Sequence, residues 1–399
     1  MHSARGYHSG MSTATHTGSS VKPSNSGSAT PKRIFNFSAG PGYLPESVIK
    51  QAQQDLWEID GTGIGIAEHS HRGKLFDRVL AEAEADCRKI ANIPANYKVL
   101  FLTGGATSQN FMVPANLLPD NGAAAYLTTG YWAEKSFEES KFYSGNVYEG
   151  WDGRGCKHDH CPTDAEITYK GEKPAYVHMC SNNTIYGTQW RNADGTFRYP
   201  KMPDASVPLV CDMSSDIYSR PFDVSRFGLI YAGAQKNLGV AGTTIVIVRE
   251  DLLKPVRKLP VMLRYETHAK DGSRHNTPPV FPIYVSGLVF KWILAQGGLE
   301  KMLQANLAKT KPIFDILDSS KFYKGHARPD SRSPMNITFR TPNEQLDELF
   351  AKEAFKQGMD QLKGHRATGG IRASTYNAFP AAGCKAMAEF MREFERTHG

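Results

Sequence analysis

The sequence lacks a long apolar run and contains few cysteines. Crossing a bilayer takes roughly 18 to 20 mostly apolar residues, and the most apolar segment, "IYVSGLVFKWILA", is shorter and contains Lys291. The six cysteines are spread over 399 residues, with no apolar signal sequence before them. This spacing excludes a dense disulfide framework. We therefore expect no membrane span and a reducing compartment.

A concentrated stretch of basic residues is also missing. The formal net charge is +7, but 47 basic residues are interleaved with 40 acidic ones along the chain. Nucleic-acid binding needs a basic stripe or patch, so we do not expect a nucleic-acid partner. A small substrate that carries several negative charges accounts for the excess equally well.

The first 33 residues contain no acidic residue and show no apolar periodicity. They are rich in Ser, Thr, Gly and His, a composition that cannot bury enough surface to fold. We predict a disordered leader over residues 1–33 of a cytoplasmic protein. Acid-poor leaders of this kind also occur as organelle transit peptides, which is the alternative.

From Ile34 onward, short apolar segments alternate with amphipathic ones. We predict strands at "KVLFL", "AAAYLTT", "AYVHM", "PLVCDM", "GLIYAG" and "TTIVIV", with helices such as "TSQNFMVPANLL" and "YWAEKSFEESKFY" between them. Continuous apolar strands separated by helices are typical of a mostly parallel sheet covered on both faces. The predicted class is α/β, with a large domain over residues 45–290.

The last part of the chain has a different pattern, rich in helices. We predict helices at "GLVFKWILAQGG", at "LEKMLQANLAKTKPIFDILD", through "EQLDELFAKEAFKQGMDQL" and finally to Glu395, with strands at "MNITFRT" and "GIRAS". This order indicates a smaller α+β domain over residues 291–399.

Four polar features follow predicted strands, where ligands bind in open α/β sheets. Asp212 ends one strand; a carboxylate there needs a cation, or it caps a helix. Lys236 follows a nearby strand, and burial or neighbouring cations would make its amine a nucleophile. Residues 103–110, "TGGATSQN", form either a phosphate-binding helix start or an ordinary turn, and match neither GxxxxGK[ST] nor GxGxxG. Tyr131 and Trp132 open a helix, where an aromatic ring stacks on a planar ligand or packs in the core.

Together these four features match one cofactor, pyridoxal phosphate. Its aldehyde requires a lysine, its pyridine nitrogen an acid, its ring an aromatic neighbour and its phosphate a glycine turn. We predict Lys236, Asp212 and Trp132 as the residues that carry the chemistry.

A further cluster, "CKHDHC" from Cys156 to Cys161, has residue types that bind metals. Four ligands within six residues cannot easily surround one zinc ion. We predict a solvated loop here and no metal site.

The sequence resembles the phosphoserine aminotransferase family, which belongs to the class V aminotransferases and to the fold-type I pyridoxal-phosphate enzymes. The resemblance runs from Ile34 to Gly399 and is carried by "FNFSAGPGYLP", "EHSHRGK", "NYKVLFLTGG", "GYWAEKS", "NNTIYG", "DMSSDIYSRPFDVSRFGLIYAGAQKN", "HNTPP", "SGLVFKWILAQGG" and "LKGHRATGGIRAS". It implies a sheet of the seven-stranded type. It also implies that residues 34–44 associate with the small domain and the active site.

The resemblance implies a role for each matching residue. Lys236 forms the Schiff base, Asp212 keeps the pyridine nitrogen protonated, Trp132 stacks on the ring and Thr184 contacts its phenolic oxygen. The cofactor phosphate is held by Ala106, Thr107 and Gln235, and by Asn276 and Thr277 from the other subunit of a homodimer. The substrate carboxylate is bound by Ser38 and Arg72, and its phosphate lies near His71, His365, Arg366 and Arg372.

The implied reaction transfers an amino group from glutamate to 3-phosphohydroxypyruvate, giving O-phospho-L-serine and 2-oxoglutarate in serine biosynthesis. The family's second activity on 4-phosphohydroxythreonine, in vitamin B6 synthesis, is left open by the sequence. Bacterial relatives have an arginine in place of Thr107, so the substrate contact made by that arginine is in doubt here. The alternatives are another class V activity and a non-enzymatic anion-binding protein.

Overall fold

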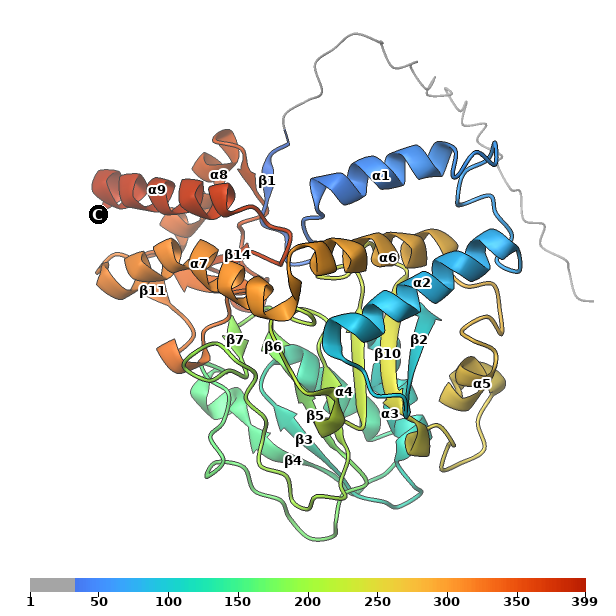
Figure 1. The fold of residues 1–399 in the computed structure, drawn as a ribbon. Helices are drawn as coiled ribbons and strands as arrows, with labels where there is room; N and C mark the ends of the chain where they lie inside the picture. The colour runs from blue at the N-terminus through green and yellow to red at the C-terminus, as the bar shows by residue number, and fades with distance from the viewer. Residues whose placement is uncertain (1–32) are drawn as a thin grey trace, which may run out of the picture. The chain divides into compact units, whose positions relative to one another are not determined.

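The computed structural model describes residues 33–399, of which residues 34–399 form one compact unit. Except for Arg33, the predicted leader lies outside the described residues. A seven-stranded sheet, the main sheet, has the strand order β2, β10, β9, β8, β5, β3, β4 (Figure 1). All its strands are parallel except β10, which is antiparallel to both neighbours. The predicted α/β class with a mostly parallel sheet is confirmed. The strand bounds are β2 Tyr97–Thr103, β3 Ala124–Thr128, β4 Val147–Asp152, β5 Val177–Cys180, β8 Leu209–Asp212, β9 Leu229–Gly233 and β10 Thr243–Arg249.

Both faces of the main sheet are buried under helices. Successive side chains of a strand point to opposite faces, so Val99 and Phe101 of β2 join one hydrophobic cluster while Leu100 and Leu102 join another. This two-sided burial explains why the strands read as continuous apolar runs. The first face is covered by α1 Glu46–Trp57, α2 Lys74–Ala91 and α6 Val280–Ala295, and the second by α3 Gln109–Leu117, α4 Tyr131–Ser140 and α5 Tyr265–Lys270.

A third hydrophobic cluster is built mostly from the C-terminal part of the chain. Its three-stranded antiparallel sheet is flanked by helices, and the N-terminal strand β1 pairs in parallel with β13 beside it. The division of the chain at residue 290 stays a prediction. The elements are β1 Phe35–Asn36, α7 Gly298–Ser319, β11 Lys324–Gly325, β12 Asn336–Arg340, α8 Glu344–Lys356, β13 Met359–Asp360, β14 Ile371–Ser374 and α9 Ala381–His398.

Short elements complete the chain. A two-stranded antiparallel hairpin follows β5. The hairpin strands are β6 Asn182–Asn183 and β7 Thr188–Gln189, and the 3₁₀ turns are η1 Ala106–Ser108, η2 Gly153–Cys156, η3 Val224–Arg226, η4 Glu250–Leu252, η5 Val261–Leu263 and η6 Pro329–Ser331.

One predicted helix is longer than the helix in the structure. The helix expected through Leu362 ends at Lys356, because Gly358 has a φ of +78°, a left-handed conformation that stops a helix. The residues that follow form β13 instead. Strand β4 was not among the predicted strands.

Within residues 33–399, no single helix has both the length and the apolar composition of a membrane span. Helices α6 and α7 meet that test only as a pair, across a bend of 84°.

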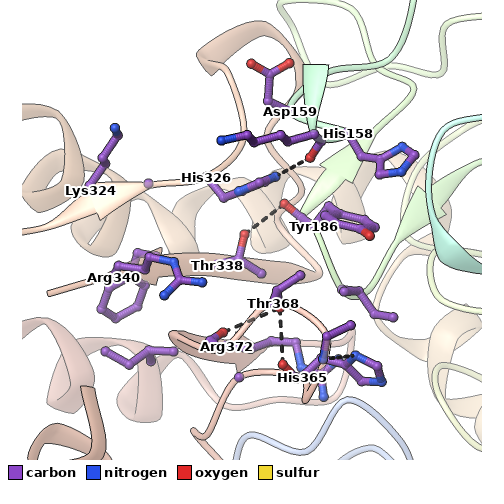
Figure 2. Close-up of a pocket in the computed structure, with 18 of the residues that line it drawn as sticks. His158, Asp159, Tyr186, Lys324, His326, Thr338, Arg340, His365, Thr368 and Arg372 are labelled. Carbon is purple, nitrogen blue, oxygen red and sulfur yellow. Dashed lines mark hydrogen bonds between the residues drawn. The ribbon is translucent and has the colours of Figure 1, made fainter. Parts of the chain in front are cut away.

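A cavity of about 790 Å³ lies between the C-terminal three-stranded sheet and the segment that follows β4 (Figure 2). The cavity is lined by β11, β12, the loop before β14, residues 154–159 and the turn between β6 and β7. Two residues of the candidate site described below, His365 and Arg372, line this cavity.

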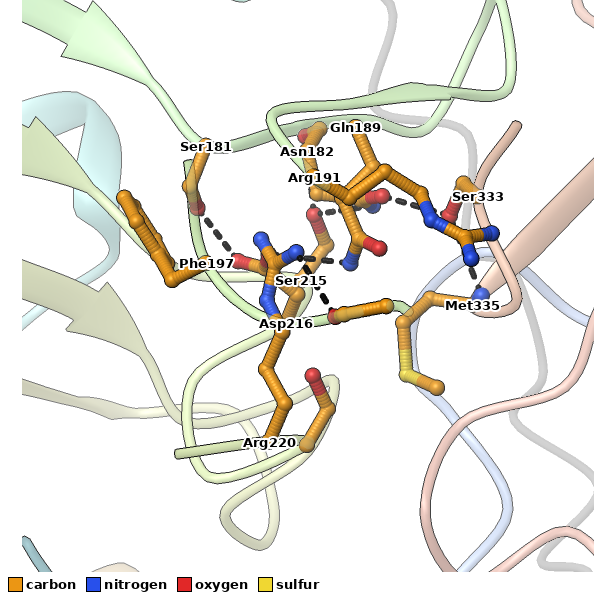
Figure 3. A network of polar contacts seen from close by, with 12 residues as sticks. Ser181, Asn182, Gln189, Arg191, Phe197, Ser215, Asp216, Arg220, Ser333 and Met335 are labelled. Atoms are coloured by element: carbon orange, nitrogen blue, oxygen red, sulfur yellow. Dashed lines mark hydrogen bonds and ion pairs between the residues drawn. The ribbon is translucent and has the colours of Figure 1, made fainter. Parts of the chain in front are cut away.

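The turn after β8 is held by a buried polar network (Figure 3). Asp216 accepts hydrogen bonds from Ser181 Oγ and, at 3.1 Å, from Gln189 Nε2, and it pairs with Arg220 at 2.9 Å. The side chains of Asp216 and Arg220 are 1% and 2% exposed. A buried charge is tolerated only when it is paired, so neither residue can be removed alone without cost.

We expect Asp216→Asn to lower the free energy of unfolding by about 3 to 5 kcal/mol, since it leaves the Arg220 guanidinium buried without a counter-charge. Urea denaturation measures the change. The control is Asp315→Asn in the exposed Lys311–Asp315 pair, which is expected to cost less than about 1 kcal/mol. Equal losses in the two variants would contradict the role given to the network.

Candidate active site

Lys236 follows β9 in the turn that leads to β10, at the edge where the parallel strands end. Its side chain is half-buried, and its Nζ lies 5.9 Å from the centroid of the Trp132 ring. Burial lowers the pKa of Lys236 below the usual value for a lysine, while the nearby Asp212 carboxylate acts in the opposite direction. Nζ forms no ion pair or hydrogen bond with any residue between 33 and 399. The amine is therefore available as a nucleophile.

Asp212 ends β8, the strand next to β9. Its Oδ1 accepts hydrogen bonds from the Ser214 backbone N–H at 2.9 Å and from Ser214 Oγ at 2.6 Å. Ser214 Oγ in turn accepts from the backbone N–H of Gly233 at 3.1 Å. No helix begins at Asp212, so the helix-capping alternative is wrong; the carboxylate closes a local turn instead, and this turn occupies one oxygen. Among the described residues nothing donates to Oδ2.

Asn237 joins the turn of Lys236 to the turn of Asp212. Its Nδ2 donates to the Ser215 carbonyl at 2.9 Å, and its Oδ1 accepts from the Asn377 backbone N–H at 3.0 Å. Sequence reasoning missed both Ser214 and Asn237. Only Ser214 gave a signal, because a serine two residues after an aspartate is typical of a local side-chain turn.

Trp132 and Thr184 contact each other near the turn of Lys236. Trp132 lies in the first turn of α4, and its Nε1 donates to Thr184 Oγ1 at 3.3 Å. The indole is 37% exposed and packs edge-on against the Tyr131 ring, with the centroids 5.1 Å apart. Core packing therefore does not account for Trp132, and part of its surface is free to contact a ligand.

The turn that contains Thr184 is held by histidine residues that sequence reasoning did not assign to the site. Tyr186 packs against the His158 ring, with centroids 4.5 Å apart, and against the His326 ring at 5.6 Å. His158 Nε2 lies 2.9 Å from Glu134 Oε1, on the same helix turn as Trp132. His158 thus links the Trp132 helix to the Thr184 turn.

The prediction of a solvated loop at "CKHDHC" is wrong. His158, His160 and Cys161 are only 4%, 5% and 2% exposed, because the segment packs under the Tyr186 turn and the C-terminal sheet. The ligand atoms of Cys156, Asp159 and His160 lie within 4.8 Å of one another. His160 contacts the carboxylates of Asp159 at 2.6 Å and of Glu166 at 3.1 Å.

The glycine turn after β2 lies beside Gln235. Gly104 has a φ of +111°, and η1 and α3 begin directly after Gly105. A Cβ placed on Gly233 would lie 2.8 Å from Gln235 Oε1 and 3.4 Å from Ala106 Cβ. The sequence-predicted phosphate residues Ala106, Thr107 and Gln235 are thus brought to one place, where the helix start presents backbone N–H groups.

The N-terminal segment packs on Lys236. The Gly42 backbone N–H donates to the Gln235 carbonyl at 2.7 Å, and Tyr376 Oη donates to the Ala39 carbonyl at 2.5 Å. A Cβ on Gly40 would lie 3.6 Å from Lys236 Cγ. Ser38 begins this loop, where its Oγ accepts from the Gly40 N–H at 3.2 Å.

Arg372, on β14, lies near the reactive amine. Its Nη1 donates to the Thr184 carbonyl at 3.2 Å, and its charge contributes to the lowered pKa of Lys236. Arg372 and His365 both line the cavity of Figure 2, while Arg366 is exposed on the same loop as His365.

The remaining predicted residues lie elsewhere in a single chain. Arg72 lines a separate surface hollow of about 560 Å³ with Asp77, Asp271, Arg274 and His275. Asn276 and Thr277 follow His275 directly, and His71 precedes Arg72. No residue of this hollow lines the cavity of Arg372.

The residues present fit pyridoxal phosphate. A nucleophilic amine, a carboxylate with one unused oxygen, a partly exposed indole and a helix start rich in N–H groups lie at the same edge of the main sheet. Lys236, Asp212, Trp132, Thr184 and the turn at Ala106 are the groups that could hold the cofactor.

The comparisons with known proteins agree with this arrangement. The model of the family "Aminotransferase class-V" matches residues 34–387. The phosphoserine aminotransferase of Lysinibacillus sphaericus is 49% identical over 369 residues, covering 92% of this chain and 99% of that protein. The phosphoserine aminotransferase of Herpetosiphon aurantiacus is 47% identical over 368 residues, with coverage of 92% and 99%.

Solved structures give the same result. The phosphoserine aminotransferase of Bacillus circulans subsp. alkalophilus has a TM-score of 0.87 and 45% identity, covering 92% of this chain and 99% of that one. A phosphoserine aminotransferase from Trichomonas vaginalis, described as bound to pyridoxal phosphate, has a TM-score of 0.82 and 33% identity, with coverage of 90% and 100%. The chain therefore belongs to the class V aminotransferases and, within them, to the phosphoserine aminotransferase family.

Proposed function

We propose that this enzyme uses pyridoxal phosphate to transfer an amino group from glutamate to 3-phosphohydroxypyruvate, giving O-phospho-L-serine and 2-oxoglutarate. The observation that carries the proposal is the half-buried Lys236 amine, which has no partner among the described residues and lies between the Asp212 carboxylate and the Trp132 indole. Family membership supports the choice of substrates, and the basic residues His365, Arg366 and Arg372 suit molecules that carry both a carboxylate and a phosphate.

The chain's own residues would divide the work as follows. When bound, pyridoxal phosphate supplies an aldehyde that condenses with amines and a ring that accepts electrons from the substrate's Cα. Asp212, through its free Oδ2, would hold a proton on the ring nitrogen, and Trp132 would cover the ring. Lys236, with its lowered pKa, would take the proton from the substrate's Cα and deliver it to the cofactor carbon that carried the aldehyde.

The position of Arg372 favours one of the two anionic groups of the substrate. The carboxylate is attached to the carbon that gives its proton to Lys236, whereas the phosphate is further away. Arg372 Nη1 donates to the carbonyl of Thr184, the residue that Trp132 contacts, at 3.2 Å, so we assign the carboxylate to Arg372 in place of the phosphate. His365 and Arg366 remain for the phosphate.

We also propose a homodimer in which each chain completes the site of the other. Arg72 and the Asn276 loop lie together, apart from Lys236 of their own chain. Large apolar side chains are exposed on the surface, including Trp57 at 85%, and such surface is typical of an interface. A second copy would bring Asn276 and Thr277 to the cofactor phosphate.

Replacing Lys236 by alanine is expected to lower kcat by at least about 10⁴-fold, because the residue that moves the Cα proton is lost. The visible absorbance of the bound cofactor should shift as well. Lys311→Ala, on an exposed helix face, is the matched control and should leave both readouts unchanged. Turnover retained by the Lys236 variant with cofactor bound would refute the assignment.

A coupled assay with three amino donors tests the substrate class. We expect kcat/KM for O-phospho-L-serine to exceed that for L-serine by about 100-fold or more, since a site built for a charged group rejects an analogue that lacks it. 4-Phosphohydroxy-L-threonine, the third donor, reports the second activity. Equal use of serine and phosphoserine would exclude the phosphate assignment of His365 and Arg366.

Mixing two inactive variants tests the shared site. Lys236→Ala removes the amine from one chain, and the double change Asn276→Ala and Thr277→Ala removes the proposed phosphate contacts from the other. After subunit exchange, hybrid dimers contain one intact site, so activity should reappear. Light scattering should give twice the mass of one chain. A monomer, or no recovery with exchange verified, would contradict the proposal.

A further inference from the structure

The cavity of about 790 Å³ is separate from the cofactor-binding space. None of Lys236, Asp212 and Trp132 lines it; it adjoins the site at Arg372 and His365 and along the turn of Tyr186, which His158 joins to Glu134. Figure 2 shows the labelled side chains of β11 and β12 on one side and those of the loop before β14 on the other. The cavity therefore lies at the entrance to the site, beside the groups expected to bind substrate.

Both acidic side chains that line the cavity have partners, although burial lowers the pKa of His158, so this histidine binds Glu134 as a neutral group and leaves its charge in place. Glu134 Oε1 lies 2.9 Å from His158 Nε2, and Asp159 pairs with Arg328 at 3.1 Å and contacts His160 at 2.6 Å. The negative charges at the wall are thus engaged by other groups.

Two lysines of the same cavity have no counter-charge, and one arginine has a distant one. Lys157 and Lys324 form no ion pair with any residue from 33 to 399, and Arg340 forms a long ion pair with Asp347, at 3.9 Å. Arg154, by contrast, is paired with Glu149 and Asp152. The cavity therefore carries an excess of positive charge.

Two of these charges are placed directly opposite each other by the sheet. In the antiparallel pair of β11 and β12, Lys324 is the register partner of Arg340, and both side chains line the cavity. Like charges directly opposite across a strand pair destabilise a sheet. An anion between them would turn this repulsion into attraction.

The Arg340 side chain is packed against a glycine turn. A Cβ on Gly369 would lie 3.5 Å from both Nη1 and Nη2, and one on Gly370 would lie 3.1 Å from Arg340 Cγ. Both glycines have left-handed φ values, +64° and +72°, and belong to the loop that carries His365. The loop thus leaves room for the guanidinium at the cavity wall.

We propose that Lys324 and Arg340 form an accessory anion site that binds the phosphate group of a phosphate monoester at the entrance to the active site. A guanidinium fork and an ammonium on paired strands of one cavity suit a dianion better than a single carboxylate. The inference rests on the proposed function, because a phosphorylated substrate would pass this site on its way to Arg372. Free inorganic phosphate has the same chemistry and would compete for the site.

Calorimetry of the holoenzyme with inorganic phosphate tests the site without relying on turnover. We expect two phosphate sites per chain in the natural protein and one in the double variant Lys324→Met, Arg340→Gln. Each single change should weaken the accessory site by about tenfold. Lys321→Met removes one exposed lysine of the same segment outside the cavity and should leave both sites unchanged.

Kinetics distinguish the two sources of phosphate. If the substrate uses the site, the double variant lowers kcat/KM for O-phospho-L-serine by about tenfold and leaves the half-reaction with glutamate unchanged. If free phosphate is the ligand, phosphate binding is lost and both half-reactions are unchanged. Each result supports the site.

Two results would overturn the inference. One is phosphate stoichiometry and affinity equal in the natural protein and in a double variant whose thermal unfolding is unchanged. The other is an equal loss in the glutamate half-reaction, which would give Lys324 and Arg340 a structural role only. Failure to transaminate phosphoserine would refute the proposed function but would leave the calorimetric result to decide on the site.

Discussion

The hydrogen bond from Asn237 Nδ2 to the Ser215 carbonyl sets the position of Lys236 relative to Asp212. Asp212 ends β8 and Lys236 follows the neighbouring strand β9. Pairing of the two strands alone would leave the turns after them free to shift. Asn237 ties the turns together, Ser214 ties Asp212 to β9, and the buried pair of Asp216 and Arg220 holds the loop beneath. Burial lowers the pKa of Lys236 and the Asp212 carboxylate raises it. The balance between the two depends on the fixed distance between Lys236 and Asp212.

A sequence identifies best those residues whose position would be energetically unfavourable without a partner or a function. Asp212 and Lys236 could be predicted because a charge at the end of an apolar strand requires a reason. Ser214 and Asn237 could not, since small polar residues are common in turns and their partners are set by the fold. The contact between Glu134 and His158 joins two separate segments of the chain, so no local sequence pattern predicts it.

The same reasoning explains the outcome for the fold. Strands buried on both faces gave apolar runs that could be read directly, as in β9 and β10. Strand β4 is an edge of the main sheet and mostly half-buried, so "VYEGWD" mixes charged and apolar residues and conceals a strand. The overlong helix before β13 followed from helix-forming residues on both sides of Gly358, whose left-handed backbone only the structure reveals.

Pairing between β1 and β13 has a consequence for the order in which the protein is made. Phe35 is among the first described residues to leave the ribosome, but its partner Met359 is translated more than 300 residues later. The loop from Ser38 to Gly42, which packs on Lys236, also contacts Tyr376. A nascent chain can therefore form the main sheet while the lysine is still uncovered on one side. The reactive amine is enclosed only when synthesis is nearly complete.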